Sequence, residues 1–139
     1  MTVEIARLGA GKKVPARGLG KIAAAILVIV EQSGAELSLA LTGNAEMKKL
    51  NAQYRGKDYA TDVLSFPLEG KQPPGNQLLG DVIISVEMAR FQARERGRTM
   101  EQEMVTLLIH GIVHLLGYDH ERSAQDARVM KRVENKVYL

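Results

Sequence analysis

The sequence predicts one mixed domain in which short strands alternate with helices around a single hydrophobic core. Its 139 residues are enough for one ordinary domain, and its composition, 45% hydrophobic and 25% charged, is that of a folded protein. Segments with alternating apolar residues are interleaved with segments of helical period, and glycine, proline or asparagine stands between them. We therefore expect a single domain over residues 1–139.

Four segments have the apolar pattern of strands. In the second of them, Leu37, Leu39 and Leu41 alternate with smaller residues. Pro67 stops the third segment, and the Pro/Gly-rich loop 73–76 precedes the fourth. The expected strands are Thr2–Leu8, Glu36–Thr42, Thr61–Phe66 and Leu78–Ser85.

Helices are expected between and after these strands. Residues 18–32 form an alanine-rich apolar helix, and in the next helix Met47, Leu50 and Tyr54 share one face. Capping residues and terminal glycines mark the helix ends. The predicted caps of the second, third and last helices are Asn44, Ser85 and Ser123, and the glycines that end the second and third are Gly56 and Gly97.

A further helix is predicted from Met100 to Leu116, because Thr99 and Gln102 form a capping box before it. Apolar residues cover almost the whole circumference of this helix. A helix that is apolar all round belongs in the core. We therefore expect it to be central and buried in the domain.

All three histidines of the chain fall within residues 110–120, and their spacing predicts a metal site. His110 and His114 stand one turn apart on one helix face, where two imidazoles can bind one metal ion. Gly117 ends the helix and lets the chain turn back, so that His120 can supply a third ligand. Three protein nitrogens leave one coordination position open, which is typical of a catalytic zinc site. A lone histidine in an apolar helix is more often a core residue, but three at this spacing favour metal binding.

The spacing also matches the zinc motif of metzincin peptidases, with one departure. Gly111 stands where those zincin-type enzymes carry the glutamate that takes a proton from the metal-bound water, so peptide hydrolysis is disfavoured. Met130 follows too soon after the histidines to form their methionine turn. Helix packing is the ordinary explanation for such a glycine, but a glycine inside a helix costs about 1 kcal/mol relative to alanine, so we expect some close approach at the site to require Gly111.

The charge pattern favours a polyanionic partner. The formal net charge is +3, and the basic residues between Arg7 and Lys21 stand in a stretch without acidic residues. A second basic cluster covers residues 48–57. Either cluster alone is more often a solvated surface. The net positive charge nevertheless favours a partner rich in phosphate groups, because neutralising phosphates supplies affinity that does not depend on sequence.

Four segments, in this order, form the most specific pattern in the chain. They are Asn51–Arg55 (Asn-Ala-Gln-Tyr-Arg), Thr61–Phe66 (Thr-Asp-Val-Leu-Ser-Phe), Leu79–Ser85 (Leu-Gly-Asp-Val-Ile-Ile-Ser) and His110–His120. Together they resemble the bacterial YbeY family of ribosomal RNA maturation factors, and the resemblance covers most of the chain. It implies an α+β fold in which helices pack on a small mixed sheet of four or five strands.

The resemblance implies a single-strand-specific, zinc-dependent endoribonuclease of the cytoplasm that matures the 3′ end of 16S rRNA and acts in ribosome quality control. The implied ligands of one zinc ion are His110, His114 and His120, and nickel or another divalent metal can replace zinc at imidazoles. The implied partners are RNA (16S rRNA or its precursor), ribosomal subunits and ribosomal proteins. No membrane partner is expected, since the apolar run Ile22–Val30 is too short to span a bilayer, and the oligomeric state stays open.

Arg55 matches the arginine that the family needs for activity. Its guanidinium can bind two phosphate oxygens at once and so stabilise the charge that develops during phosphodiester cleavage. Judged from the residues alone, an ion pair with Asp58 or Asp62 is the commoner role for such an arginine. The attacking group stays open between the RNA 2′-hydroxyl and a zinc-bound hydroxide.

Three further residues are weaker candidates for the site. Asp119 stands beside His120, where it either orients a ligand imidazole or only forms a turn. Asp62 and Ser65 lie on an expected strand and either line the cleft or face solvent. Two other functions also stay open: a metzincin-like peptidase that uses another base, and a ribosome assembly factor with a mainly structural metal site.

Overall fold

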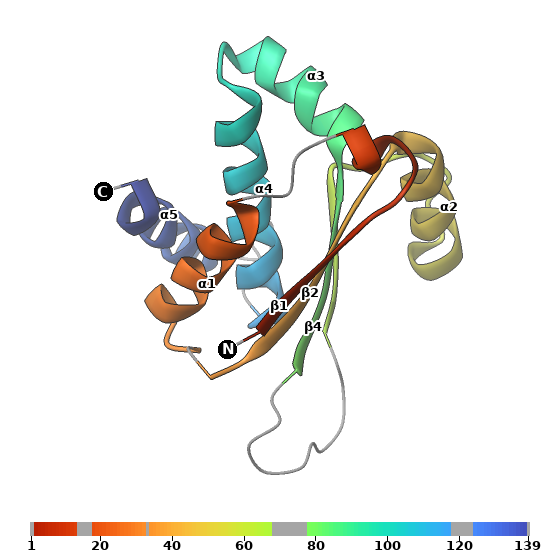
Figure 1. The fold of residues 1–139 in the computed structure, drawn as a ribbon. Helices are drawn as coiled ribbons and strands as arrows, with labels where there is room; N and C mark the ends of the chain where they lie inside the picture. The colour runs from red at the N-terminus through yellow and green to blue at the C-terminus, as the bar shows by residue number, and fades with distance from the viewer. Residues whose placement is uncertain (1, 14–17, 33, 68–77, 118–123, 139) are drawn as a thin grey trace.

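The computed structural model describes residues 2–13, 18–32, 34–67, 78–117 and 124–138, which form a four-stranded mixed sheet with helices packed on it (Figure 1). This agrees with the expected α+β class. The strands are β1 (Thr2–Arg7), β2 (Glu36–Thr42), β3 (Val63–Pro67) and β4 (Leu78–Ser85). The helices are the 3-10 helix η1 (Gly9–Lys13), α1 (Leu19–Ile29), α2 (Asn44–Arg55), α3 (Val86–Arg96), α4 (Met100–Leu115) and α5 (Ala124–Tyr138).

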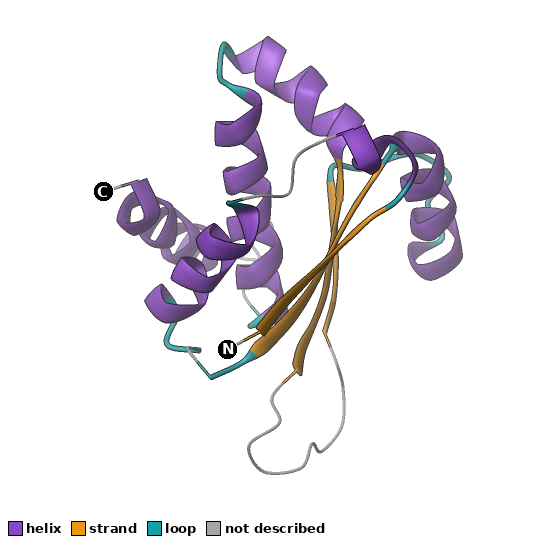
Figure 2. Ribbon diagram, viewed as in Figure 1, coloured by secondary structure: helices purple, strands orange, loops and turns teal. Residues whose placement is uncertain are grey.

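The sheet has the strand order β1-β2-β4-β3. β1, β2 and β4 run parallel, whereas β3 pairs antiparallel with β4 and forms one edge. The predicted alternation in β2 is confirmed, because Leu37, Leu39 and Leu41 are all buried in the core. Helices α1, α4 and α5 lie together on one side of the sheet and α2 lies on the other side (Figure 2).

Helix α4 is central, as its apolar circumference predicts. It contacts α1, α3, α5, β3 and β4, and eleven of its sixteen residues are buried. The predicted capping box is present: the Thr99 hydroxyl accepts a hydrogen bond from the Gln102 backbone N–H (3.1 Å), and the Gln102 side chain accepts one from the Thr99 N–H (3.0 Å). Gly117, just past the helix, has the expected left-handed conformation (φ 94°).

The predicted close approach at Gly111 is also present. A Cβ atom at this position would lie 2.5 Å from a methyl carbon of Val82 on β4 and 3.3 Å from a methyl carbon of Val63 on β3. Such distances are shorter than van der Waals contact, so a side chain here would push the helix from the sheet. Gly111 therefore sets how closely α4 lies against the two strands.

The prediction that Asn44 caps α2 is wrong. Gly43 is the N-cap, and Asn44 is the first residue of the helix. Its backbone N–H instead donates to the carboxylate of Glu87 on α3 (2.8 Å), while its side-chain oxygen accepts from the Ser85 hydroxyl (2.6 Å). A carboxylate from another helix thus replaces the local cap, since negative charge is favourable at a helix N-terminus.

The face of α2 that carries Met47, Leu50 and Tyr54 is buried only in part. Met47 and Asn51 are the buried residues of this helix, while Tyr54 is 60% exposed and contacts the edge of the Phe66 ring, 5.3 Å away between centroids. Helix α2 packs against β4 and α3 through a narrow face.

The strand predicted at 61–66 is shifted along the chain. It begins at Val63 and includes Pro67, which pairs with Gly80 of β4. Proline is tolerated there because β3 is an edge strand and does not need every N–H for pairing. Asp62, expected on the strand, lies just before it.

No helix in the described ranges is long and apolar enough to cross a membrane.

Candidate functional site

A cavity of about 540 Å³ lies where the C-terminal ends of α2 and α3 meet β3 and α4. Five of the residues that the sequence predicted for the site line it. They are Arg55, Asp62, Ser65, His110 and His114. The other lining residues are Asn51, Lys57, Tyr59, Thr61, Val63, Leu64, Arg96 and Gly111. Two further predicted residues, Asp119 and His120, lie outside the described residues.

His110 and His114 are partly buried on α4, and both line the cavity. Buried residues of α4 on either side of them pack in the core, so the backbone that carries both imidazoles is held firmly. The described residues contain no cluster of three or more His, Cys, Asp or Glu side chains able to hold a metal ion. Two imidazoles one turn apart still fit the nitrogen ligands that zinc prefers. The third predicted ligand, His120, lies outside the described residues.

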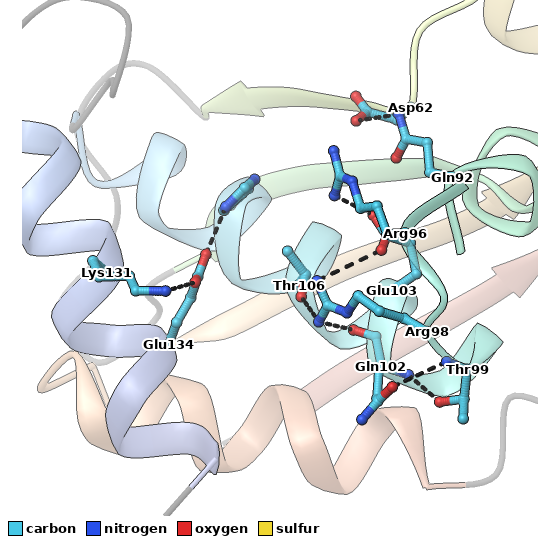
Figure 3. A network of polar contacts seen from close by, with 11 residues as sticks. Asp62, Gln92, Arg96, Arg98, Thr99, Gln102, Glu103, Thr106, Lys131 and Glu134 are labelled. Carbon is cyan, nitrogen blue, oxygen red and sulfur yellow. Dashed lines mark hydrogen bonds and ion pairs between the residues drawn. The ribbon is translucent and has the colours of Figure 1, made fainter. Parts of the chain in front are cut away.

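A carboxylate not anticipated from the sequence contacts the first histidine. Glu134 of α5 lies with one carboxylate oxygen 2.8 Å from Nε2 of His110. Its other oxygen is 3.8 Å from the Lys131 ammonium, and its side chain is 18% exposed (Figure 3). In the tautomer with its proton on Nε2, the imidazole donates a hydrogen bond to Glu134. The lone pair available to a metal ion is then the one on Nδ1. Glu134 stands in a strongly polar segment, so its sequence gives no signal that sets it apart.

Arg55 is the last residue of α2, and its side chain is exposed at the cavity. The left-handed Gly56 ends the helix behind it (φ 68°). In the described part of the chain, neither of the predicted acidic partners forms an ion pair with Arg55: Asp58 pairs weakly with Lys48 (3.9 Å), and Asp62 contacts other groups. The ion-pair alternative to a role in the site is therefore not realised in this structure.

Asn51 fixes the loop that follows Arg55. It is almost fully buried, and its side-chain amide donates to the backbone oxygen of Tyr59 (2.8 Å). Its own backbone oxygen accepts from the Lys57 N–H (3.2 Å). The loop with Lys57 and Tyr59 is thus held against the end of α2. Asn51 belongs to a recognised motif, but its role in the loop was not predicted.

The two weaker candidates on the β3 side have defined contacts. The Asp62 carboxylate accepts hydrogen bonds from the Val63 backbone N–H (2.8 Å) and the Gln92 side chain (3.2 Å). The Ser65 hydroxyl donates to the backbone oxygen of Gly111 (2.9 Å) and so joins β3 to the helix that carries the histidines. Both residues line the cavity, and Ser65 also has a structural role there.

The charges around the cavity are mostly positive. Arg55, Lys57 and Arg96 line it, whereas Asp62 is the one carboxylate among the described lining residues. A cavity with an excess of positive charge attracts anions, and its walls strengthen the attraction by excluding water. The arrangement therefore suits a phosphate-bearing ligand beside the two imidazoles.

Comparison with known proteins gives a consistent result. Residues 11–139 match a family model described as Endoribonuclease YbeY. The chain is similar to the Endoribonuclease YbeY of a Sulfurihydrogenibium species, with 42% identity over 91% of this chain and 84% of the relative. It is also similar to the protein of that name from Aquifex aeolicus, with 44% identity over 91% of this chain and 83% of the relative.

A solved structure has the same fold. The solution structure of the Thermotoga maritima protein TM1509 superimposes with a TM-score of 0.68 and 32% sequence identity. The match covers 97% of this chain and 85% of the other. The overall fold described above is therefore shared with an experimentally determined structure.

Proposed function

The chain belongs to the Endoribonuclease YbeY family, and we propose that it is a metal-dependent endoribonuclease that cleaves single-stranded RNA in the cavity between α2, β3 and α4. One observation supports the proposal most strongly. The imidazoles of His110 and His114 and the guanidinium-bearing Arg55 come from distant parts of the sequence and line one positively charged cavity. A metal ion at the imidazoles and a phosphate-binding cation can together stabilise the negative charge that develops when a phosphodiester is cleaved.

The proposed metal is a single zinc ion, held by His110, His114 and, from the sequence motif, His120. When bound, it would supply a Lewis acid that stabilises negative charge on the phosphoryl oxygens. Glu134 would hold the His110 ring in one orientation through the 2.8 Å contact. Ser65 would fix the helix backbone at Gly111 and so keep both imidazoles at a constant distance from β3.

Arg55 would bind the phosphate that is to be cleaved. A guanidinium donates two parallel hydrogen bonds to phosphate oxygens and stays charged at every physiological pH. Its exposed position at the cavity lets a phosphate of an RNA strand reach it. The preference for single-stranded RNA is the part of the proposal that comes from the family resemblance.

The biological setting is part of the same proposal. We infer that the substrate is 16S rRNA or its precursor, and that the protein acts in the cytoplasm on ribosomal subunits during 3′-end maturation and ribosome quality control. The basic clusters at 7–21 and 48–57 support an RNA-rich partner through their sequence-independent attraction to phosphates.

The test compares cleavage of a single-stranded RNA and metal content in four proteins. Wild type is measured beside Arg55→Ala, His114→Ala and a control, Arg90→Ala, whose arginine is exposed on α3 and does not line the cavity. We expect Arg55→Ala to keep its metal and to lose cleavage by about 100-fold, since one charge-stabilising donor typically contributes that much. His114→Ala should lose both metal and cleavage.

Two results would overturn the proposal. Cleavage that survives both Arg55→Ala and His114→Ala in highly purified protein would point to a contaminating nuclease. Normal 16S rRNA processing in cells that carry only an inactive variant would instead favour an assembly factor with a mainly structural metal site.

A further inference from the structure

Arg96, the last residue of α3, lies in the same cavity as His110 and Arg55. We propose that Arg96 forms a second phosphate-binding position, which holds a backbone phosphate of the RNA strand next to the one bound at Arg55. The inference rests on the proposed function for the identity of the strand. It does not depend on the metal or on the identity of the attacking group.

The basis for this position is a buried carboxylate. Glu103 of α4 is fully buried, and one of its oxygens lies 2.8 Å from a terminal guanidinium nitrogen of Arg96 (Figure 3). Its other oxygen lies 3.7 Å from a guanidinium nitrogen of Arg98. A buried carboxylate is costly unless it is paired, so Glu103 requires a cation. It has two, and two guanidinium groups around one carboxylate leave an excess of one positive charge.

The two arginines share Glu103 but differ in what else they contact. Arg98 is 30% exposed, and it also donates to the Thr106 hydroxyl (2.8 Å) and to the Gln102 backbone oxygen (3.4 Å). It does not belong to the residues that line the cavity. Arg96 lines the cavity, its side chain is 51% exposed, and its described contact uses one nitrogen. Arg98 therefore completes the buried cluster, while Arg96 presents the excess charge to the cavity.

Pairing with Glu103 also prepares Arg96 for binding. A free arginine side chain loses conformational entropy when it binds a ligand, but one that is already held by a buried partner loses less. A guanidinium has five N–H donors, so the bond to one Glu103 oxygen leaves donors for a phosphate. Figure 3 shows Arg96 between the buried Glu103 and the side chains of Gln92 and Asp62, and Asp62 also lines the cavity.

The experiment measures how binding of a single-stranded oligodeoxynucleotide by the metal-loaded protein depends on salt. The probe has the phosphates of RNA but no 2′-hydroxyl, and a gel after each titration checks that it is intact. Arg96→Gln is compared with wild type and with Arg94→Gln, which removes the same charge from an exposed residue of the same helix outside the cavity. Arg98→Gln is the control for the loss of one cation from Glu103.

We expect Arg96→Gln to weaken binding about ten-fold, the typical effect of one charge-assisted hydrogen-bonding group. The slope of the logarithm of affinity against the logarithm of salt concentration should fall by roughly 0.7, the value for one phosphate contact to a single strand. Arg94→Gln should change both quantities little. Arg98→Gln should lower the melting temperature and leave the salt slope unchanged.

The outcomes separate this inference from the proposed function. If wild type cleaves RNA but Arg96→Gln binds with the affinity and salt slope of Arg94→Gln, Arg96 only neutralises Glu103 and the inference is wrong. If wild type does not bind the oligodeoxynucleotide, the inference is also wrong. If wild type fails to cleave RNA while Arg96→Gln still loses one phosphate contact, the phosphate position stands and the nuclease proposal fails.

Discussion

The two halves of α4 use their polar side chains in different ways. In the N-terminal half, Glu103 is fully buried and meets the guanidinium groups of Arg96 and Arg98. In the C-terminal half, His110 and His114 are partly exposed and line a cavity. We call the first the closed half, because its buried carboxylate is paired with cations of the same chain, and the second the open half, because its imidazoles line the cavity. A polar group on a buried helix is thus structural or functional according to what surrounds it, and burial alone does not decide between the two.

The largest effect on stability should come from removing both cations of the closed half. The double substitution Arg96→Gln with Arg98→Gln leaves Glu103 buried without a counter-charge, which typically costs about 3 to 5 kcal/mol. Urea unfolding measures this cost. The matched control is Arg90→Gln with Arg94→Gln, which removes two exposed arginines from α3, the helix that ends at Arg96. If the two double variants lose the same free energy of unfolding, pairing of Glu103 with the two arginines does not stabilise the fold.

The open half should respond in metal affinity more than in stability. Glu134→Gln removes the carboxylate that contacts His110, and loss of such an orienting partner typically lowers metal affinity about 10- to 100-fold. Competition with a zinc chelator measures the affinity directly, without recourse to cleavage. Lys131→Ala is the control, because Lys131 is 72% exposed and reaches only the far oxygen of Glu134. Unchanged metal affinity in Glu134→Gln would show that the carboxylate does not orient the imidazole for the metal, and tighter binding would show that it competes with the metal for His110.

The contact between the open half and the sheet can be tested at Gly111. In Gly111→Ala the new methyl group would lie 2.5 Å from a Val82 methyl carbon, and Val82 is a fully buried, stiff side chain. We expect a net loss of about 1 to 3 kcal/mol from overpacking, even though alanine favours the helix.

The reciprocal variant makes this a specific test. In a Val82→Ala background the methyl group at residue 111 has room, so the same substitution should cost much less. If Gly111→Ala costs the same in both backgrounds, the close approach to Val82 is not what requires glycine.

Much of this arrangement could be predicted from the sequence because its causes are local. The capping box at Thr99 and the apolar circumference of the next helix predicted a central, buried α4, and the alternation in β2 predicted its buried face. The cavity brings together residues from three of the recognised motifs, on α2, β3 and α4. Periodicity and helix caps act within a few residues, so they are visible before folding.

The contacts that were missed are tertiary contacts between charged side chains. The run from Glu87 to Arg98 has the pattern of one exposed helix face, yet Glu87 caps α2 and Arg96 pairs with Glu103. Glu103 itself stands in a position where an acidic residue simply favours the start of a helix. Charged residues on a polar face all look alike in a sequence, and the packing of other elements decides which of them is buried or paired.

The smallest expected effect concerns the N-terminal cap of α4, and it tests whether the two halves of the helix respond independently. Thr99→Ala removes the hydroxyl that accepts the Gln102 N–H, and loss of such a cap typically costs about 1 kcal/mol. Thr99→Ser keeps a hydroxyl and is the control. His110 follows Thr99 by roughly three helical turns, while fraying is confined to the first turn, so we expect thermal unfolding to shift by a few degrees and zinc affinity to stay unchanged. A parallel fall in zinc affinity would show that the closed half also sets the geometry of the open half, because the helix would then respond as one rigid unit.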